Sequence, residues 1–464
     1  MSGAELQARF DALARAVRSV VRGDEFCCAW LQAEDSHFIR INQGRLRQAG
    51  SVCRAQATLR LIVGARQASL AITLADDAGP ALLTQVSSAV DMLRAVLEDS
   101  EDDPLLDVCR DPVVSDDRAG HPVQPGDLDD LIRVLASPLS KENSLPLADQ
   151  GDLVGFVAAG SLGRGFCSSA GAMQWFERAS ISVDGSIHLP TDPVSGDRRA
   201  VKFGWSGETP DAAALAAAVE RARREAAVLL RPARRLAHGD YRALLQPRAF
   251  ADLLGMLEWG GYSARAHRSG QSPLARLRSG QAAFSPLLNL AEDLDAGFAP
   301  AFQADGYPRA RRVELIRHGQ FADWLVSPAS AREFDLTGNA ANAQEVPESV
   351  VVGCGTMHDA HALNRLETGV LLSNLWYLNY SDREACRITG MTRFACLWVE
   401  HGEAVAPIEA MRFDDSLFRV LGAQGLEALG QHAERMPQTE TWEGRATGGI
   451  LAPAALVAGL RFTL

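Results

Sequence analysis

The feature that most constrains the fold is a long stretch in which apolar and polar side chains alternate. It covers residues 26–74 and is interrupted by Asn42, Gly44, Gly50 and Gly64. Alternation places successive side chains on opposite faces of a strand, and asparagine and glycine mark the turns between strands. The segment therefore predicts an antiparallel meander.

Helices are predicted on both sides of this meander. Residues 4–22 and 79–97 carry apolar side chains at helical spacing. A third helix is predicted from about residue 128. A fourth follows Thr209 and Pro210, which suit the N-cap and the first helical position. The first half of the chain is therefore expected to combine antiparallel strands with helices.

The pattern breaks between residues 98 and 130. This segment holds twelve Asp or Glu residues against two Arg residues, and it also contains four prolines. Like charges repel and proline interrupts regular structure, so the segment is interpreted as a solvated acidic linker.

The rest of the chain alternates between short apolar runs and turn residues, which predicts paired strands. Turns are expected at Asp305-Gly306, His318-Gly319, Thr389-Gly390 and His401-Gly402. The fold class is α+β. The predicted parts are an N-terminal α/β domain (1–97), the acidic linker (98–130), a middle α/β segment completing the first domain (131–236) and a β-rich C-terminal domain (237–464).

Composition restricts the class of protein. Hydrophobic residues make up 47% and charged residues 22% of the chain, as in soluble globular proteins, and the net charge is −12. This charge argues against binding to nucleic acid or to an anionic membrane. The N-terminus lacks the pattern of a signal peptide, and the eight cysteines are scattered, so we expect reduced thiols and a cytoplasmic location.

The stretch from Phe250 to Trp259 predicts a helix with one apolar face. A zinc peptidase would carry on such a helix two histidines, with a glutamate beside the metal-bound water. Here the glutamate is present as Glu258, but Leu257 precedes it and Tyr262 follows four residues later. The helix is therefore either a degenerate active site or an ordinary buried helix.

The chain resembles the TldD/PmbA (TldE) family of metallopeptidase-like proteins. The resemblance rests on residues 41–50, on the stretch from Asp305 through residues 337–340, and on residues 369–403 with their Thr-Gly and His-Gly-Glu turns. It implies an N-terminal α/β domain, a β-rich C-terminal domain and a dimer that encloses a cavity. In this family TldD carries the zinc motif His-Glu-x-x-x-His and a late cysteine ligand, whereas TldE lacks them.

Carried over residue by residue, the resemblance implies a degenerate zinc site. The first ligand position falls on Leu257, the glutamate on Glu258 and the second ligand position on Tyr262. The third ligand would be a cysteine within residues 431–449, but the last cysteine of the chain is Cys396. A lone carboxylate does not hold zinc against its hydration shell. We therefore expect no cofactor in this chain, with zinc only in a partner subunit.

Other residue clusters were weighed as sites. Cys354, His358 and His361 could converge on a metal if the segment 356–366 is helical, although a capping role explains the same residues. The three glycines of Gly160-x-x-Gly163-x-Gly165 lack the strand–loop–helix setting and the lysine of a phosphate-binding loop, and they are interpreted as turn glycines.

Four residues are expected to line the cavity implied by the resemblance: Glu258, Tyr262, Arg265 and His267. The aromatic residues Trp324, Trp376, Tyr377 and Trp398 are assigned to the core or to a dimer interface.

The expected function is that of a non-catalytic TldE-like subunit, inactive alone, which pairs with a TldD-like zinc peptidase homologue acting on unfolded or precursor peptides. Two alternatives remain open. One is an active metallopeptidase with non-standard ligands, for which Cys354, His358 and His361 come first. The other is a homodimer that binds a peptide or small molecule without cleaving it.

Overall fold

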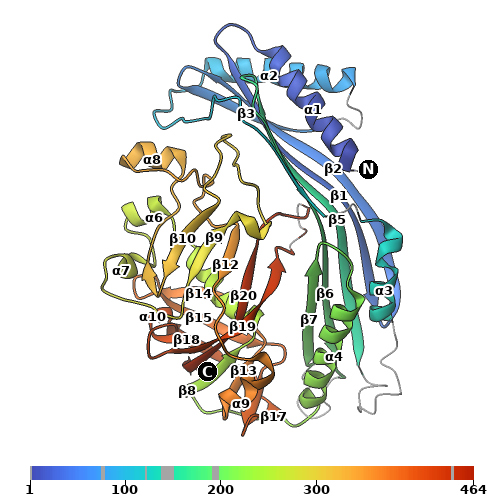
Figure 1. Cartoon of the computed structure of the whole chain (residues 1–464), viewed down its shortest axis with the longest axis vertical. Helices are drawn as coiled ribbons and strands as arrows, with labels where there is room; N and C mark the ends of the chain where they lie inside the picture. The colour runs from blue at the N-terminus through green and yellow to red at the C-terminus, as the bar shows by residue number, and fades with distance from the viewer. Residues whose placement is uncertain are drawn as a thin grey trace.

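The computed structural model describes residues 3–74, 79–120, 123–136, 151–190, 198–439, 441 and 444–463. Figure 1 shows a long, curved sheet from the first half of the chain beside a compact β-rich second half. Helices and strands both contribute widely, so the predicted α+β class is confirmed. None of the described helices is long and apolar enough to cross a membrane.

The first half is built on a seven-stranded sheet in the order β3-β2-β1-β5-β6-β4, with β7 also paired to β6. Its strands are β1 (Phe26–Asn42), β2 (Arg45–Val63), β3 (Arg66–Thr73), β4 (Val114–Ala119), β5 (Asp152–Ser168), β6 (Met173–His188) and β7 (Ala200–Gly207). The antiparallel ladders β1–β2 and β2–β3 are the predicted meander, which is confirmed.

Helices α1 (Gly3–Val20) and α2 (Pro80–Glu98) lie on one face of the meander at the top of Figure 1. Their apolar faces, with Leu13 and Val90 fully buried, pack on inward-facing strand residues such as Leu31 and Leu59. Burial of these faces removes apolar area from water, which is the main favourable term for such an assembly. The two predicted helices are therefore confirmed to within two residues.

The segment predicted as an acidic linker differs from that interpretation. Strand β4 lies within it and pairs in parallel with β6, from Val114 opposite Met173 to Ala119 opposite Arg178. An Asp117 oxygen accepts a hydrogen bond from Arg178 at 2.8 Å. Composition alone did not predict this strand. One ion pair with β6, between Arg178 and Asp117, and one within β4, between Arg118 and Asp116, offset the repulsion between its acidic side chains.

The glycines of residues 160–165 lie in the interior of β5, which pairs with β1 on one side and β6 on the other. The prediction that they are turn glycines is therefore wrong. A Cβ at Gly165 would lie 2.6 Å from the Phe10 ring, and one at Gly163 would lie 2.7 Å from the Trp175 ring. These glycines therefore leave room for large buried side chains.

Two short helices and one long helix complete the first half. They are η1 (Pro125–Leu128), α3 (Asp129–Ala136) and α4 (Ala212–Leu229). The predicted cap of α4 is wrong by two residues, since Asp211 and not Thr209 is the N-cap, and its carboxylate accepts the Ala214 N–H at 2.9 Å. Helix α4 packs between β7 and β17, so its buried side chains belong to a core shared by both halves.

The second half is a thirteen-stranded, branched sheet. Its strands are β8 (Gly239–Leu245), β9 (Leu290–Asp293), β10 (Arg312–Arg317), β11 (Gln320–Phe321), β12 (Ser349–Val352), β13 (Gly369–Leu372), β14 (Asn374–Asp382), β15 (Arg387–Arg393), β16 (Leu397–Glu400), β17 (Glu403–Pro407), β18 (Arg412–Ser416), β19 (Leu426–Pro437) and β20 (Gly449–Phe462).

The helices of the second half are short. They are α5 (Pro247–Gly255), η2 (Met256–Glu258), α6 (Ala264–Arg268), α7 (Ala275–Arg278), η3 (Leu294–Ala296), α8 (Pro328–Phe334), η4 (Asp359–His361), α9 (Ala362–Leu366) and α10 (Leu417–Val420). Strand β20 is central, since it pairs with β8, β12, β18 and β19. The core of this half gathers around β20 and α5.

Of the predicted turns, those at residues 305–306, 318–319 and 401–402 are confirmed. His401 and Gly402 both have positive φ, as do His318 and Gly319, which suits tight two-residue hairpins. The turn predicted at Thr389-Gly390 is wrong, because both residues lie inside β15 and the chain reverses at residues 383–386 instead. Gly390 is a glycine because a Cβ there would lie 2.7 Å from the Phe413 ring, and not because the chain turns.

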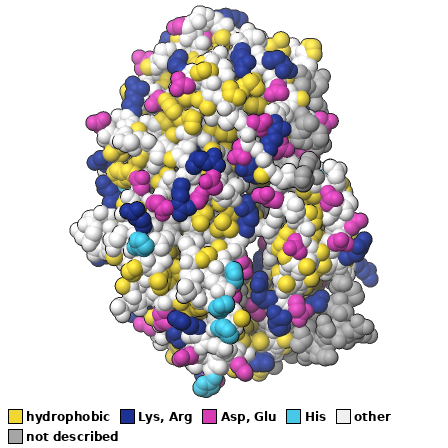
Figure 2. Space-filling model, viewed as in Figure 1, with side chains coloured by type: hydrophobic (Ala, Val, Ile, Leu, Met, Phe, Trp, Pro, Cys, Tyr) yellow, Lys and Arg dark blue, Asp and Glu magenta, His cyan; other side chains and the backbone are white. Residues whose placement is uncertain are grey.

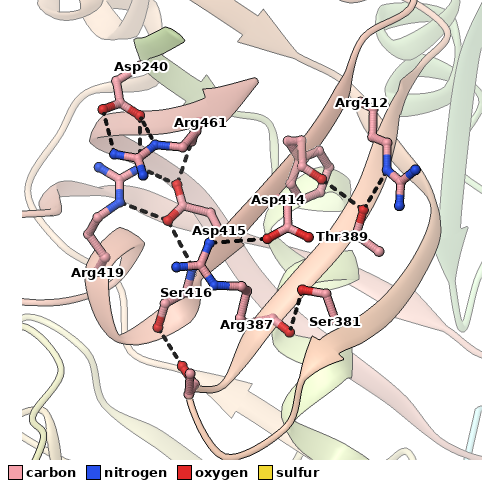
Figure 3. Close-up of polar contacts among 12 residues, drawn as sticks. Asp240, Ser381, Arg387, Thr389, Arg412, Asp414, Asp415, Ser416, Arg419 and Arg461 are labelled. Carbon is pink, nitrogen blue, oxygen red and sulfur yellow. Dashed lines mark hydrogen bonds and ion pairs between the residues drawn. The ribbon is translucent and has the colours of Figure 1, made fainter. Parts of the chain in front are cut away.

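Charged groups tie the end of the chain to the core of the second half (Figure 3). The Asp415 carboxylate, nearly fully buried at the end of β18, accepts the Arg461 backbone N–H at 3.0 Å and the Arg419 Nε at 2.8 Å. Asp240 on β8 accepts from the Arg461 side chain at 3.0 Å. Strands β18 and β20 and helix α10 therefore meet at the Asp415 carboxylate, and Asp240 joins β8 to the same network through Arg461.

The loop at residues 301–307 docks the second half onto the first. Phe302 is buried among Phe26, Phe166 and Phe176 of the N-terminal sheet. The Asp305 carboxylate pairs with Arg60 at 2.7 Å, and its carbonyl accepts the Cys109 N–H at 2.9 Å. Apolar burial and a partly shielded ion pair therefore hold the halves together.

We expect Asp305→Asn to lower the free energy of unfolding by about 1 kcal/mol. The substitution removes a charge-assisted hydrogen bond whose two side chains are about 20% exposed, and partial exposure reduces its strength. The control is Asp295→Asn, which removes an ion pair with Arg311 whose side chains are 64% and 62% exposed. Urea unfolding of both variants measures the difference, and equal effects would contradict a specific role for Asp305.

Candidate functional site: the degenerate motif at the end of α5

Helix α5 presents the predicted motif residues to the core of the second half. Pro247 occupies its first turn, and Phe250, Leu253 and Leu254 are buried against neighbouring strands. The helix ends earlier than predicted, at Gly255, and continues as the single turn η2 to Glu258. The chain then reverses, because Gly260 has φ +83° and a Cβ at Gly261 would lie 2.2 Å from the Leu257 oxygen.

This reversal separates the two ligand positions of the motif. Leu257 has no exposed side-chain surface and belongs to the apolar core. Its carbonyl oxygen accepts the Gly261 N–H at 2.9 Å. Tyr262 lies beyond the turn, and its own backbone pairs with Leu325. The two positions therefore do not face each other from successive turns of one helix.

Glu258 is the motif residue with unusual chemistry. Its carboxyl group is largely buried, and no hydrogen bond or ion pair to it is found among the described residues. Burial, together with the negative charge of Glu292, raises its pKa to about 7. Glu258 can therefore give or take a proton near neutral pH, as a general acid or base must.

Tyr262 is 1% exposed, and its hydroxyl has no hydrogen-bond partner within the described part of the chain. Burial raises its pKa well above the ordinary value, with further contributions from Glu258, Tyr380 and Cys386. The nearby Tyr380 hydroxyl donates to the Met256 carbonyl at 2.5 Å. Glu258 thus sits beside neutral phenols, and a phenol with a raised pKa is a poor metal ligand.

Glu292 and Arg309 complete the surroundings, and neither was singled out from the sequence. Their side chains are 3% and 2% exposed and form an ion pair of 2.5 Å, and Arg309 also contacts Glu348 at 2.5 Å. The Glu348 N–H donates to Glu292 at 2.9 Å. The sequence signal that could have identified Glu292 is a glutamate that directly follows two apolar residues, Leu290 and Ala291, in a short buried strand.

The residues at the motif do not fit a zinc ion. Zinc requires three or four nitrogen, sulfur or oxygen donors, whereas the first ligand position carries a buried leucine and the second a buried phenol. No group of three His, Cys, Asp or Glu residues that could hold a metal occurs in the described ranges. Residues 440, 442 and 443, within the stretch searched for a third ligand, lie outside those ranges.

The sequence of this half matches a known family. Residues 238–464 match the family described as PmbA/TldA metallopeptidase C-terminal domain. The second half is a PmbA/TldD-family domain. A comparison with curated proteins finds no match to the chain.

Solved structures share the fold over the whole chain. TldE from Thermococcus kodakarensis aligns with a TM-score of 0.77 at 13% identity, covering 98% of this chain and 100% of that one. A candidate DNA gyrase modulator from Thermotoga maritima gives 0.70 at 13% identity, covering 99% and 100%. Another from Bacteroides thetaiotaomicron gives 0.71 at 14%, covering 99% and 98%. At such low identity these matches establish the fold alone.

Arg265 and His267 lie on α6 in the PmbA/TldD-family domain, and each has a local role. The Arg265 side chain is exposed, while its N–H donates to Glu345 at 2.8 Å. His267 Nε2 lies 2.8 Å from the Gly261 oxygen, and the ring packs edge-on against Phe321. Burial lowers the His267 pKa to about 4, so it is neutral at pH 7. Neither has a described contact with Glu258.

The alternative metal cluster of the PmbA/TldD-family domain lies on its surface. Cys354, His358 and His361 are exposed, and the two imidazole rings lie 6.0 Å apart. The condition for that cluster, a helix over 356–366, is met only in part, since η4 begins at Asp359 and α9 at Ala362. His432, far away in sequence, hydrogen-bonds Asp359 at 2.8 Å. These residues do not form a group that could hold a metal within the described ranges.

Proposed function

We propose that this protein is the non-catalytic subunit of a TldD/TldE-type metallopeptidase complex that acts on unfolded or precursor peptides. A homologue with an intact His-Glu-x-x-x-His motif would supply the zinc ion and the chemistry. This chain would complete the chamber that receives the peptide.

The observation that carries the proposal is the chemistry at the two ligand positions. Leu257 is embedded in the core and Tyr262 has a buried phenol, so neither offers a donor that could hold zinc. Glu258 keeps a carboxyl group with a pKa near neutrality. A carboxyl group without a metal-bound water beside it has no activated nucleophile to attack a peptide bond.

Exposed aromatic residues at β14 support pairing with a second chain. Trp376 and Tyr377 are 44% and 68% exposed, and Trp259 is 50% exposed beside Tyr380 of the same strand. Within the described part of the chain, β14 pairs only with β15. Exposed tryptophan and tyrosine are enriched at protein interfaces, and an unpaired strand edge offers backbone hydrogen bonds to a partner. An exposed aromatic surface of this kind also suits the homodimeric binding protein.

The test is to express this chain alone and together with a zinc-motif homologue from the same genome. We expect a stable heterodimer that contains one zinc ion, located in the homologue. Cleavage of an unfolded protein substrate is expected from the heterodimer and not from this chain alone.

Two outcomes would contradict the proposal. Zinc bound stoichiometrically by the isolated chain, with chelator-sensitive cleavage, would make it an enzyme with non-standard ligands. His358→Ala would then decide whether the surface cluster supplies those ligands. A stable homodimer that does not exchange with the homologue would favour the binding protein.

A further inference from the structure

Four exposed arginines form a patch on the two short helices that follow the motif. They are Arg265 and Arg268 on α6 and Arg276 and Arg278 on α7, and together they are called the arginine patch. Residues 259–291 contain no Asp or Glu, although the whole chain has a net charge of −12. Figure 1 shows α6 and α7 at the outer edge of the second half, on the side away from β6 and β7. The fold therefore presents a local cationic surface on an acidic protein.

Two of these guanidinium groups share one aromatic ring. The Arg278 Cζ lies 4.1 Å from the centre of the Trp324 ring, and the Arg268 Cζ lies 5.7 Å from the same ring centre. The face of an indole attracts a cation, and a guanidinium stacked on it keeps the N–H groups at its edge free for another partner. The His267 ring also packs against Trp324, with 5.9 Å between the ring centres. Trp324 therefore holds two like charges close together.

The arginine patch has no carboxylate partner. None of its four guanidinium groups forms an ion pair or donates a hydrogen bond within the part of the chain that the structure describes. Burial and the positive charge of Arg268 lower the pKa of Arg278, because both disfavour its charged form. Over the face drawn in Figure 2, in contrast, basic side chains lie among acidic ones. The patch therefore lacks the counter-charge that an anionic ligand would supply.

Acidic residues of the neighbouring segments do not neutralise the patch. Glu345 is 1% exposed, and its carboxylate accepts the Arg265 backbone N–H at 2.8 Å. The Asp323 carboxylate accepts the Trp324 backbone N–H at 2.8 Å. Glu333 is exposed on α8, which contacts α6. Among the described residues, none of these three carboxylates lies within ion-pair distance of a patch guanidinium.

Buried polar contacts hold the turn that carries the patch. The Ser263 hydroxyl caps α6 by accepting the Ala266 N–H at 3.1 Å, and it donates to Glu345 at 2.6 Å. The Ser272 hydroxyl, at the start of the approach to α7, donates to the Gly261 carbonyl at 3.3 Å. Both helices are therefore anchored to the turn that ends the motif. A surface that is already ordered loses less freedom on binding, which favours affinity.

The chemistry of the patch fits a short acidic segment of a polypeptide. A guanidinium binds a carboxylate through two parallel N–H groups, so neighbouring arginines suit neighbouring Asp or Glu side chains. The Trp324 ring and the Phe418 ring, 5.8 Å from the Arg276 Cζ, place aromatic surface beside these cations. A long polyanion such as nucleic acid would also meet the rest of an acidic protein, which repels it. A short segment needs to cover only the patch.

We propose that the arginine patch binds acidic segments of the unfolded or precursor peptide that the complex receives. This inference rests on the proposed function, which supplies the peptide. Arg265 lies only seven residues after Glu258, so the patch adjoins the turn of the degenerate motif. It would make the complex favour peptides rich in Asp and Glu.

The test uses the full-length chain and the fluorescence anisotropy of two labelled peptides. One is Gly-Glu-Glu-Gly-Asp-Glu-Gly, and the other has Gln and Asn in place of Glu and Asp. We expect the acidic peptide to bind at least tenfold more tightly than the neutral one. The double substitution Arg268→Gln and Arg278→Gln should weaken binding of the acidic peptide at least tenfold. Raising the salt concentration should weaken binding of the acidic peptide alone, because the interaction is ionic.

The matched control is the double substitution Arg311→Gln and Arg365→Gln. It removes two exposed arginines outside the patch and changes the net charge equally, so both peptides should bind as they do to the wild type. Circular dichroism establishes that each variant is folded. Equal affinities for the two peptides, undiminished binding to the variant of Arg268 and Arg278, or tighter binding of a double-stranded DNA oligonucleotide would overturn the inference.

Co-expression with the zinc-motif homologue separates this inference from the proposed function. The variant of Arg268 and Arg278 should still form the heterodimer. Loss of the heterodimer in this variant would assign the patch to the partner subunit and overturn the inference. A wild-type chain that binds the acidic peptide but forms no active heterodimer would contradict the proposed function and still confirm that the patch binds acidic segments.

Discussion

Asp415→Ala is expected to lower the free energy of unfolding by about 3 kcal/mol. The Asp415 side chain is 3% exposed, and it accepts hydrogen bonds from the backbone N–H groups of Ser416 and Arg461 as well as from Arg419 (Figure 3). Its removal leaves buried N–H donors without acceptors and leaves Arg419 with only its longer contact to Asp240, at 3.4 Å. Guanidinium chloride unfolding at pH 7 measures the loss.

The adjacent residue provides the control for this prediction. Asp414 pairs with Arg387 at 3.1 Å, but their side chains are 25% and 39% exposed, so water can replace the interaction. Asp414→Ala should therefore change the free energy by less than about 1 kcal/mol. If the two variants lose similar amounts of unfolding free energy, burial does not determine how much Asp415 stabilises the protein. The network in Figure 3 would then contribute no more than exposed ion pairs do.

Glu258→Gln is expected to stabilise the protein by about 2 kcal/mol above pH 7 and to have little effect at pH 4.5. Burial and Glu292 raise the folded-state pKa of Glu258 to about 7, above the ordinary value for an unfolded chain. The folded protein therefore favours the protonated carboxyl. The stability that this group contributes is present below the unfolded pKa and is lost as pH rises through 7. Glutamine keeps the neutral form at every pH.

Urea unfolding of the wild type and the variant at pH 4.5, 6, 7 and 8.5 tests this linkage. The difference should grow from pH 4.5 to 7 and then level off, and partial access of water to Glu258 holds it below the full value that the pKa difference alone would produce. Glu333→Gln, at an exposed glutamate, should show no such trend. A difference that shrinks as pH rises would mean that Glu258 has an unrecognised cationic partner.

The candidate site was only partly predictable. The sequence shows Leu257 before Glu258 and Tyr262 four residues after it. These two residues replace the two histidine ligands of the motif, so the loss of the zinc ligands was predictable from the sequence. It did not predict that the chain reverses at Gly260 or that Glu292 lies close enough to raise the Glu258 pKa. Pairs such as Glu292 with Arg309 depend on how a loop packs against a strand, and spacing along the chain does not encode them.

Local patterns by themselves determined the meander of residues 26–74, the helices that flank it and the hairpin turns at His318 and His401, because strand and helix periods and positive-φ turns depend on neighbouring residues. Tertiary structure alone decided that the acidic segment adds strand β4 and that Arg445 meets Ser36 and Ser180. The Arg445 contacts join residues 409 and 265 positions apart, and only the packing of the two halves brings them together.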